Sequence, residues 1–260
     1  MPSFQPTRCQ KFRSQLLCGS PVTGTFVKTP SPIVCEVLAL TRLDAVCLDA
    51  EHAPFGRLEL DGCIAMLRAN DMPSLVRVPS ADPAHILNAL DCGATGIIVP
   101  HVKTADEARQ VAAAARFGDG GRGYAGSTRA ACYTRGKMPD NLRANREETV
   151  VIIQVEDLDG VAAIDEIVAV DGIDCVFVGR IDLTVALAAG SPDDAPVVAA
   201  VEQICSSCRR AERPVGMFVP RLDELPKWRK AGASLFLLSS DHSFLLNGAD
   251  KLVDDVAGLV

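Results

Sequence analysis

The sequence has no long apolar run and no concentrated positive charge. None of its apolar stretches approaches the roughly 18 residues of a membrane span, which excludes a transmembrane helix. The N-terminal stretch MPSFQPTRCQKFRSQ is polar and basic and lacks an apolar h-region, so we expect no signal peptide. The net charge is −7 and the Lys and Arg residues are scattered, which argues against nucleic acid or an anionic membrane as a partner.

The chain has ten cysteines, but it lacks the pattern of a disulfide framework or of a cysteine metal site. Cys35, Cys47 and Cys175 fall in apolar periodic runs, where a free cysteine behaves as a small hydrophobe. Cys205 and Cys208 form a CxxC pair inside a helical pattern, and no second pair lies at metal-binding spacing. This usage favours a reducing, cytoplasmic location.

From Thr23 onward, short apolar runs alternate with helical patterns. The runs are continuously apolar, as expected of parallel strands that are covered on both faces. We expect eight strands, at residues 24–27, 45–49, 74–78, 96–99, 149–155, 174–178, 214–218 and 234–239. We expect a helix after each strand, at residues 32–43, 58–70, 83–92, 104–116, 160–169, 194–212, 221–231 and 243–257.

Eight such units without a dinucleotide-binding fingerprint predict an α/β fold, a single (β/α)8 TIM barrel domain spanning residues 1–260. A doubly wound open sheet is the competing interpretation, because strand order cannot be read from the sequence. Residues 1–20 are interpreted as an amphipathic lead-in to the barrel. Residues 117–148 are expected to form a long loop, and loops of that length are usually functional or disordered. Its glycine-rich segment does not directly follow a strand, so we do not interpret it as a phosphate cradle.

Charged and polar residues gather where the predicted strands end. In a parallel barrel the carboxyl ends of the strands form one rim, and that rim carries the active site. The residues at these ends are Asp49, Glu51, His52, Arg77, His101, Gln154, Glu156, Gly179, Arg180, Ile181, Asp182 and Ser239-Ser240-Asp241-His242.

Four of these positions suggest a chemistry. Glu156 and Asp182 end neighbouring strands and can reach one hard divalent cation, such as Mg²⁺ or Mn²⁺, although each could instead cap a helix. His52 is the natural general base, since its unperturbed pKa of roughly 6.5 lies near working pH. Arg77 could clamp a carboxylate or stabilise an enolate oxygen; its alternative role is a core salt bridge.

The ordered motifs LDAEHAP, LVRVP, LDCGATGIIVP, RGYAGSTRA, QVE and VFVGRIDL resemble the HpcH/HpaI class of metal-dependent pyruvate aldolases. The resemblance runs from about Gly24 to the C-terminus. It implies that Glu156 and Asp182 bind a divalent metal, namely Mg²⁺, Mn²⁺ or Co²⁺. It also implies that His52 is the catalytic histidine and that Arg77 stabilises the enolate.

Further positions carry roles only through this resemblance. Asp91, in LDCG, matches the aspartate that partners the catalytic histidine. Asp49, Glu51 and Gln154 match positions that support the metal site or its waters. The residues Gly179, Arg180 and Ile181 fall in the loop at the substrate end of the metal site.

Such enzymes bind pyruvate or a related 2-oxo acid, remove a proton from C3 and add the resulting enolate to an aldehyde. Cleavage is the reverse reaction. The resemblance also implies a homo-oligomer, commonly a hexamer or trimer of dimers, with C-terminal helices exchanged between subunits. The apolar periodicity of the segment 243–257 permits that exchange.

Several residues depart from the family pattern. Arg180 stands where proline is usual, which predicts an extra positive charge at the substrate end of the metal loop. His101 replaces a commoner methionine, Arg42 stands near a usual glycine, and the segment 239–242 is more polar than usual. These changes favour an anionic substrate and leave the acceptor open, so a citrate synthase-like condensation with an acyl thioester stays an alternative. The roles of His101 and His242 also stay open.

Two other interpretations remain. A Schiff-base aldolase would need a rim lysine, and Lys28 and Lys103 are the candidates. A non-catalytic barrel that serves only in binding is the third, although it need not retain the carboxylates, the base and the arginine together.

Overall fold

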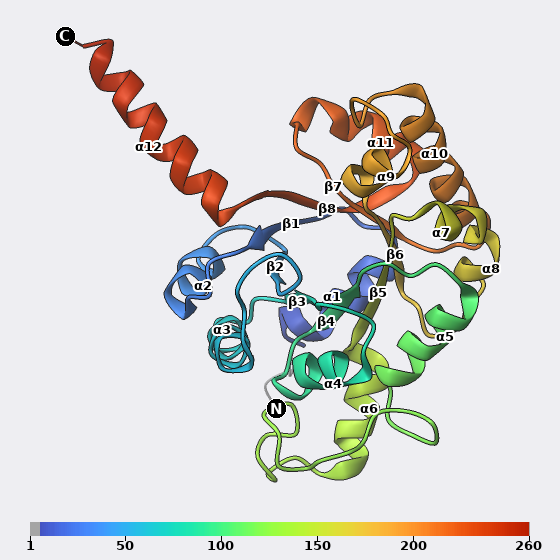
Figure 1. Cartoon of the computed structure of the whole chain (residues 1–260). Coiled ribbons are helices and arrows are strands. Elements are labelled where there is room, and N and C mark those ends of the chain that lie inside the picture. Colours follow the sequence, from blue (N-terminus) through green and yellow to red (C-terminus); the bar gives the residue numbers. More distant parts are fainter. Residues whose placement is uncertain (1–5, 260) are drawn as a thin grey trace.

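Eight parallel strands pair in chain order and the last pairs with the first, closing a barrel in the computed structural model, which describes residues 6–259 (Figure 1). The strands are β1 Val22–Val27, β2 Ala45–Asp49, β3 Ser74–Arg77, β4 Gly96–Val99, β5 Val150–Val155, β6 Cys175–Val178, β7 Val215–Phe218 and β8 Ala233–Ser240. This closed order confirms the predicted (β/α)8 TIM barrel and rules out the open sheet.

Helices surround the barrel and connect successive strands (Figure 1). They are α1 Arg8–Leu17, α2 Pro32–Ala39, α3 Arg57–Ala69, α4 Pro83–Asp91, α5 Ala105–Ala114, α6 Met138–Glu148, α7 Leu158–Ala162, α8 Ile164–Val168, α9 Arg180–Ala186, α10 Ala195–Arg210, the 3₁₀ turn η1 Leu222–Glu224, α11 Leu225–Ala231 and α12 Asp241–Ala257.

Strand residues alternate between two hydrophobic clusters. In β2, Ala45 and Cys47 belong to the cluster inside the barrel, whereas Val46 and Leu48 belong to the cluster between the strands and the helices. This alternation is the period of two that a strand imposes on its side chains. Both faces of the strand are buried, which explains the continuously apolar runs in the sequence.

Helix α1 belongs to the predicted lead-in, of which residues 1–5 lie outside the described part of the chain. Its Phe12 and Leu16 are buried in the interior cluster with Val22 and Val150, which open β1 and β5. Since Val22 and Val150 lie at the amino ends of their strands, α1 closes the end of the barrel opposite the rim.

Two helices were not expected. The segment predicted as a loop at residues 117–148 ends in α6, which buries only Asn145 and therefore shows no apolar period in the sequence. The short helix α9 starts directly after β6 and has too few turns to be recognised by periodicity. The helix expected at residues 160–169 is divided into α7 and α8 at Ala163.

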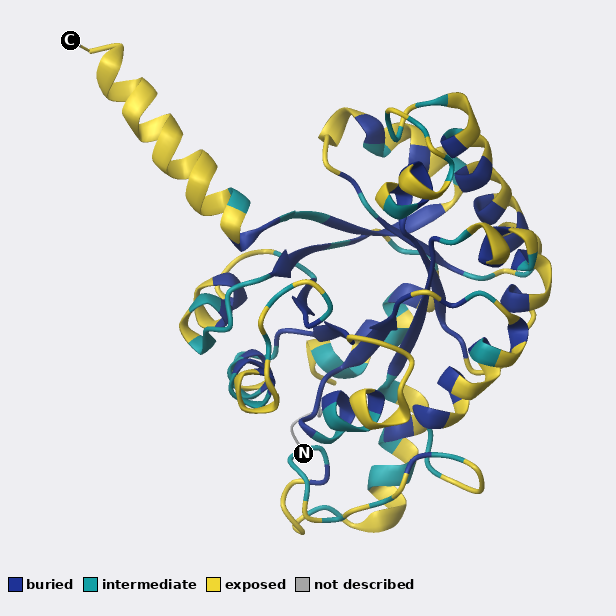
Figure 2. Cartoon of the chain, viewed as in Figure 1, coloured by how far each residue is buried: buried dark blue, intermediate teal, exposed yellow. Residues whose placement is uncertain are grey.

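The last helix, α12, projects away from the barrel, and nearly all of its length is exposed (Figures 1 and 2). Its base is held by Asp241, whose carboxylate accepts hydrogen bonds from the backbone N–H groups of Lys28 at 2.8 Å and Thr29 at 3.0 Å. His242 Nε2 lies 3.1 Å from Thr29 Oγ1. The polar end of β8 therefore joins α12 to the segment after β1.

No helix between residues 6 and 259 is both long enough and apolar enough to cross a membrane. All ten cysteines lie in this described range and are free thiols.

Candidate active site

A buried ion-pair network links the ends of β2 and β3. Asp49 and Arg77 are register partners in neighbouring strands, so their side chains meet at the rim. Arg77 Nη2 lies 2.8 Å from Asp49 Oδ1, and Arg77 Nε lies 3.3 Å from Glu51 Oε2. Asp49 is fully buried, and Arg77 is 8% exposed. The guanidinium of Arg77 is thus held by two carboxylates, which fix its orientation.

His52 stands at the edge of this network. Its backbone N–H donates to Asp49 Oδ1 at 3.2 Å, and its Nε2 lies 3.6 Å from Glu51 Oε2. The side chain is 55% exposed. The backbone of His52 is therefore held in place, whereas its imidazole is accessible to a molecule in the barrel mouth.

Glu156 occupies the end of β5 and is 2% exposed. Burial, with the neighbouring Asp182 carboxylate, raises the pKa of Glu156 to about 7, although a hydrogen bond from Gln154 and the nearby His101 oppose this rise. Gln154 donates to Oε2, and the backbone N–H of His101 donates to Oε1 at 3.0 Å. Two carboxylates held this close favour a proton or a cation between them.

Gly179 leaves the space that Glu156 needs. A Cβ atom at Gly179 would lie 2.5 Å from Glu156 Cβ, a contact that real side chains do not make. The tight passage between β6 and α9 therefore requires glycine, and it brings Asp182 next to Glu156.

Several of these residues line a cavity of ≈ 390 Å³ in the barrel mouth. Seven predicted site residues line it: His52, Arg77, Gln154, Gly179, Arg180, Ile181 and Asp182. Its other lining residues are Phe26, Lys28, Phe177, Val178, Phe218, Ser239, Ser240 and Ser243. The cavity is large enough for a small organic acid, and it combines aromatic walls with cationic and hydroxyl groups.

A second set of potential metal ligands overlaps the predicted pair. Ligand atoms of Glu51, His101 and Glu156 lie within 4.8 Å of one another. The sequence does not predict a role for His101. The structure shows that its backbone is left-handed, with φ of 56°, a conformation that is often found at functional sites.

The residues around Glu156 suit a hard divalent cation. In the described part of the chain, Asp49 Oδ2, Glu51 Oε2 and Gln154 Oε1 are buried without a hydrogen-bond partner. Buried oxygens of this kind are uncommon in folded proteins. Asp49 Oδ2 and Glu51 Oε2 face Lys28 and Arg77, respectively, whereas Glu51, Glu156 and Asp182 supply the carboxylate oxygens that Mg²⁺ and Mn²⁺ prefer.

Arg180 differs from its expected role. Its guanidinium is turned toward α11: Nη1 lies 2.5 Å from Glu224 Oε2, and the group stacks 4.8 Å from the centre of the Trp228 ring. The side chain is 3% exposed. Its positive charge is therefore neutralised within the protein and does not form a free cation at the substrate end of the loop.

Asp91 lies apart from the rim network. It ends α4, and its Oδ1 lies 3.2 Å from Arg122 Nη1. Burial raises the pKa of Asp91, against the influence of Arg122. Within residues 6–259, no ion pair joins Asp91 to His52, the partner that the resemblance implies.

The two candidate Schiff-base lysines are both ion-paired. Lys28 Nζ lies 3.5 Å from Asp49 Oδ2, and Lys103 Nζ lies 3.4 Å from Asp157 Oδ1. Only Lys28 lines the cavity. Because both amines are engaged with carboxylates, the structure offers little support for a Schiff-base mechanism.

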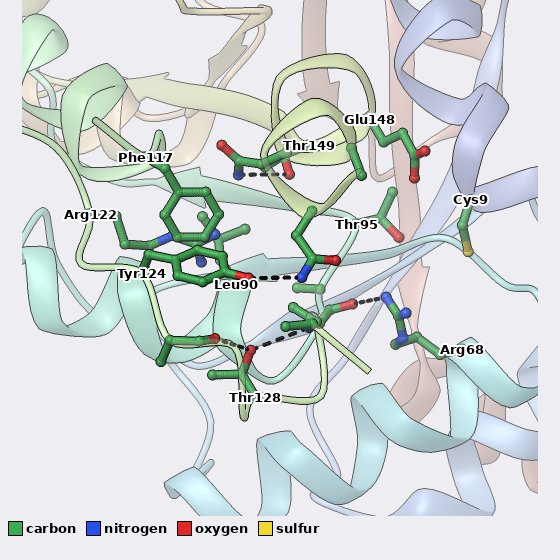
Figure 3. Close-up of a pocket in the computed structure, with 18 residues that line it drawn as sticks. Cys9, Arg68, Leu90, Thr95, Phe117, Arg122, Tyr124, Thr128, Glu148 and Thr149 are labelled. Carbon is green, nitrogen blue, oxygen red and sulfur yellow. Dashed lines mark hydrogen bonds between the residues drawn. The ribbon is translucent and has the colours of Figure 1, made fainter. Parts of the chain in front are cut away.

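Figure 3 shows a separate cavity of ≈ 120 Å³ at the side of α4. Arg122 stacks on Phe117 at 4.1 Å there, and Asn141 donates a hydrogen bond to Tyr124 Oη. It contains none of the predicted metal ligands or the predicted base. The candidate active site is therefore the cavity at the rim.

Comparison with known proteins identifies the family of the chain. The family model described as HpcH/HpaI aldolase/citrate lyase matches residues 22–248. The chain is 31% identical over 246 residues to a 5-keto-4-deoxy-D-glucarate aldolase of Klebsiella pneumoniae, covering 94% of this chain and 95% of that protein. It is 30% identical over 245 residues to a hydroxypyruvate/pyruvate aldolase of Roseovarius nubinhibens, with 94% and 95% covered.

A solved structure of a family member also resembles this chain. A HpcH/HpaI aldolase/citrate lyase family protein from Burkholderia cenocepacia J2315 superposes with a TM-score of 0.89 at 31% identity. The match covers 95% of this chain and 99% of that one. Both the sequence and the three-dimensional arrangement agree over nearly the whole chain, so the protein belongs to the HpcH/HpaI aldolase/citrate lyase family.

Proposed function

We propose that this protein is a metal-dependent aldolase that forms and cleaves carbon–carbon bonds through the enolate of a 2-oxo acid. The observation that carries the proposal is that Asp182, Arg77 and the solvent-accessible His52 line one cavity, with the buried Glu156 next to Asp182. Each group has a role in enolate chemistry, and the three come from different strands of the barrel.

Glu156 and Asp182 are the residues that would hold the cation, with Mg²⁺ and Mn²⁺ as the preferred ions and Co²⁺ as a further option. A bound divalent cation would supply Lewis-acid polarisation of the 2-oxo group. Asp49, Glu51 and Gln154 are proposed to orient this site and its waters, because Gln154 donates to Glu156 and the two carboxylates hold Arg77.

Arg77 is proposed to donate to the oxygen on which charge develops during enolate formation. Its pairing with Asp49 and Glu51 fixes the guanidinium before substrate arrives, so little reorganisation is needed in the transition state. His52 is proposed to take the C3 proton, since its imidazole is accessible from the cavity. Gly179, Arg180 and Ile181 would shape the substrate end of the cavity, with Arg180 contributing through its pairing with Glu224.

The substrate class follows from the relatives. The name 5-keto-4-deoxy-D-glucarate describes a keto group next to a carboxylate and a deoxy carbon, which is a 2-oxo acid with an acidic C3 position. We propose a donor of the same class, pyruvate being the simplest. Lys28, Ser239 and Ser240 line the remaining part of the cavity and would suit a polar acceptor aldehyde. Condensation with an acyl thioester is the second candidate, because the family's description also includes citrate lyase.

A homo-oligomer is also proposed. Figure 2 shows that α12 is exposed over nearly all of its length. Leu245, Leu252 and Val256 are spaced so that they share one face of this helix, and all three are more than half exposed. A second copy of the chain, exchanging the same helix, would bury this face, in a hexamer or trimer of dimers. The cytoplasmic location stays a prediction, with which the free cysteines agree.

The test is NMR-detected exchange of the pyruvate methyl protons in D2O, with Mg²⁺ or Mn²⁺ and with a chelator. We expect exchange that requires the metal and is lost in Glu156→Ala and His52→Ala. The exposed His85→Ala variant serves as the matched histidine control and should retain exchange. Absence of exchange with every metal would overturn the pyruvate assignment and would favour a protein that only binds.

A further inference from the structure

We propose that the imidazole of His101 is a direct ligand of the active-site cation, so that this protein binds its metal through nitrogen as well as carboxylate oxygen. The inference rests on the proposed function, because it concerns the same cation. It adds His101 to the predicted ligands Glu156 and Asp182. It also predicts which metal ions the site prefers.

The backbone places the imidazole beside two carboxylates. His101 follows β4 with a φ of 56°, a left-handed conformation in which histidine is among the more tolerated residues. Its backbone N–H donates to Glu156 Oε1, which fixes the turn against the predicted metal ligand. Its Nε2 lies 3.6 Å from Glu51 Oε1. Two ligand atoms about 2.1 Å from one cation, at an angle of about 90–120°, are about 3.0–3.6 Å apart, so this separation suits a shared ion.

Asp157 orients the ring. His101 Nδ1 lies 3.0 Å from Asp157 Oδ2 and 3.4 Å from Glu156 Oε1, so a hydrogen bond to Asp157, the nearer carboxylate, places the proton on Nδ1 and leaves the lone pair of Nε2 available. Metal-binding histidines commonly donate their other ring nitrogen to a carboxylate in this way. The pairing of His101 with Asp157 therefore prepares Nε2, the atom that faces Glu51, for a cation.

Glu51 provides an independent observation. Its side chain is 9% exposed; its Oε2 faces Arg77 Nε, whereas its Oε1 faces His101 Nε2 at 3.6 Å. A carboxylate buried to this extent needs compensating positive charge. Arg77 supplies part of it at 3.3 Å, and a cation between Glu51, His101 and Glu156 would supply the rest.

The ligand change has a chemical consequence. An all-oxygen site suits Mg²⁺, whereas an imidazole favours later transition metals, in the order Mn²⁺, Fe²⁺, Co²⁺, Ni²⁺. We therefore expect this protein to prefer Co²⁺ over Mg²⁺ by a larger factor than the His101→Met variant, which restores the residue that is commoner in the family.

The experiment is electron spin echo envelope modulation of Mn²⁺ bound to the full-length protein, with calorimetric titration of Mg²⁺ and Co²⁺. We expect nitrogen modulation from a bound imidazole in the wild type and in His85→Gln, and its loss in His101→Met and His101→Asn. Asparagine tolerates the left-handed backbone, so it separates ligand loss from misfolding. Labelling the histidines of the wild-type protein with nitrogen-15 should change the nitrogen modulation of bound Mn²⁺, and this control requires no substitution.

Asp157→Asn should weaken Co²⁺ binding by about 10–100-fold, as removal of a carboxylate behind a metal-bound histidine usually does. If the protein binds one Mn²⁺ per chain but shows no nitrogen modulation, His101 is not a ligand, and the proposed aldolase function is unaffected. Modulation that persists in both His101 variants would assign the ligand to another histidine. Failure of the wild type to bind any of these metals would overturn the aldolase proposal as well.

Discussion

Arg180 and Glu224 form a buried ion pair, with Nη1 and Oε2 2.5 Å apart, between the start of α9 and the start of α11. Trp228 Nε1 donates to the same carboxylate at 3.3 Å. The arginine that marks the substrate loop in sequence therefore has a structural role in the protein. It joins the two helices that follow β6 and β7.

Removal of one member of this pair should be strongly destabilising. Glu224→Gln leaves the Arg180 guanidinium buried with weakened compensation, and we expect a loss of about 3–5 kcal/mol in the free energy of unfolding. Urea denaturation measures it. The double variant Arg180→Pro, Glu224→Gln should recover much of the loss, because proline is tolerated in the first turn of a helix. Additive losses in the double variant would contradict the pairing.

Arg77→Lys should impair catalysis more than folding. Lysine keeps the charge near Asp49 and Glu51 but cannot make the same forked contacts. We expect the pyruvate proton-exchange rate to fall by about 100-fold or more, the usual cost of losing a donor to a developing oxyanion. Arg109→Lys, at an exposed arginine on α5, is the control and should leave the rate unchanged. An equal rate in Arg77→Lys would exclude Arg77 from the reaction.

The anchoring of α12 should depend on pH. Burial raises the pKa of Asp241, but hydrogen bonds from Thr29 and from the backbone N–H groups of Lys28 and Thr29 outweigh it, so the pKa in the folded protein is lowered. A depressed carboxylate pKa stabilises the fold above the unfolded value, about 3.9, and this contribution disappears as pH falls through the folded pKa.

Asp241→Asn tests this dependence. The difference in unfolding free energy between wild type and variant should be largest near neutral pH and should vanish in acid. Urea titrations across that range measure it, with Asp250→Asn on the exposed part of α12 as the control. A difference that is constant with pH would exclude ionisation of Asp241 as the cause.

Asp91 pairs with Arg122 in its own chain, so we predict that it partners the His52 of another subunit. Mixing inactive His52→Ala and Asp91→Ala proteins, unfolded and refolded together, should then restore activity. Sites that combine an intact histidine with an intact aspartate would form in about one quarter of cases on random assembly. No recovery would assign Asp91 to a structural role beside Arg122.

The exposed apolar face of α12 predicts that this helix forms an interface between subunits. Leu252→Glu with Val256→Glu would place charges in the interface that we propose, and we expect a smaller assembly by light scattering coupled to size exclusion. Lys251→Glu, next to this face but ion-paired with Asp255, is the control. An unchanged mass for the double variant would show that α12 lies outside the interface.

The sequence predicts the barrel well because each buried strand leaves a continuous apolar run, and each amphipathic helix leaves a period. It misses α6 because that helix buries only Asn145, so no period exists to detect. The rim position of Arg180 is predictable, but its direction is not, since its partner Glu224 lies on a later element. The pairing of His101 with Asp157 is likewise a contact between β4 and β5 ends, which only the closed barrel brings together. The site roles taken from the resemblance remain predictions until the variants are measured.

Gly179 limits how this active site could be redesigned. Any side chain there would collide with Glu156 and displace the carboxylate from Asp182. Libraries that seek new acceptor substrates should therefore hold Gly179 constant and vary Ile181 and Phe218, which line the cavity without supporting the carboxylates. The same constraint makes Gly179 a poor target for stabilising glycine replacements, although such replacements are often useful elsewhere in a protein.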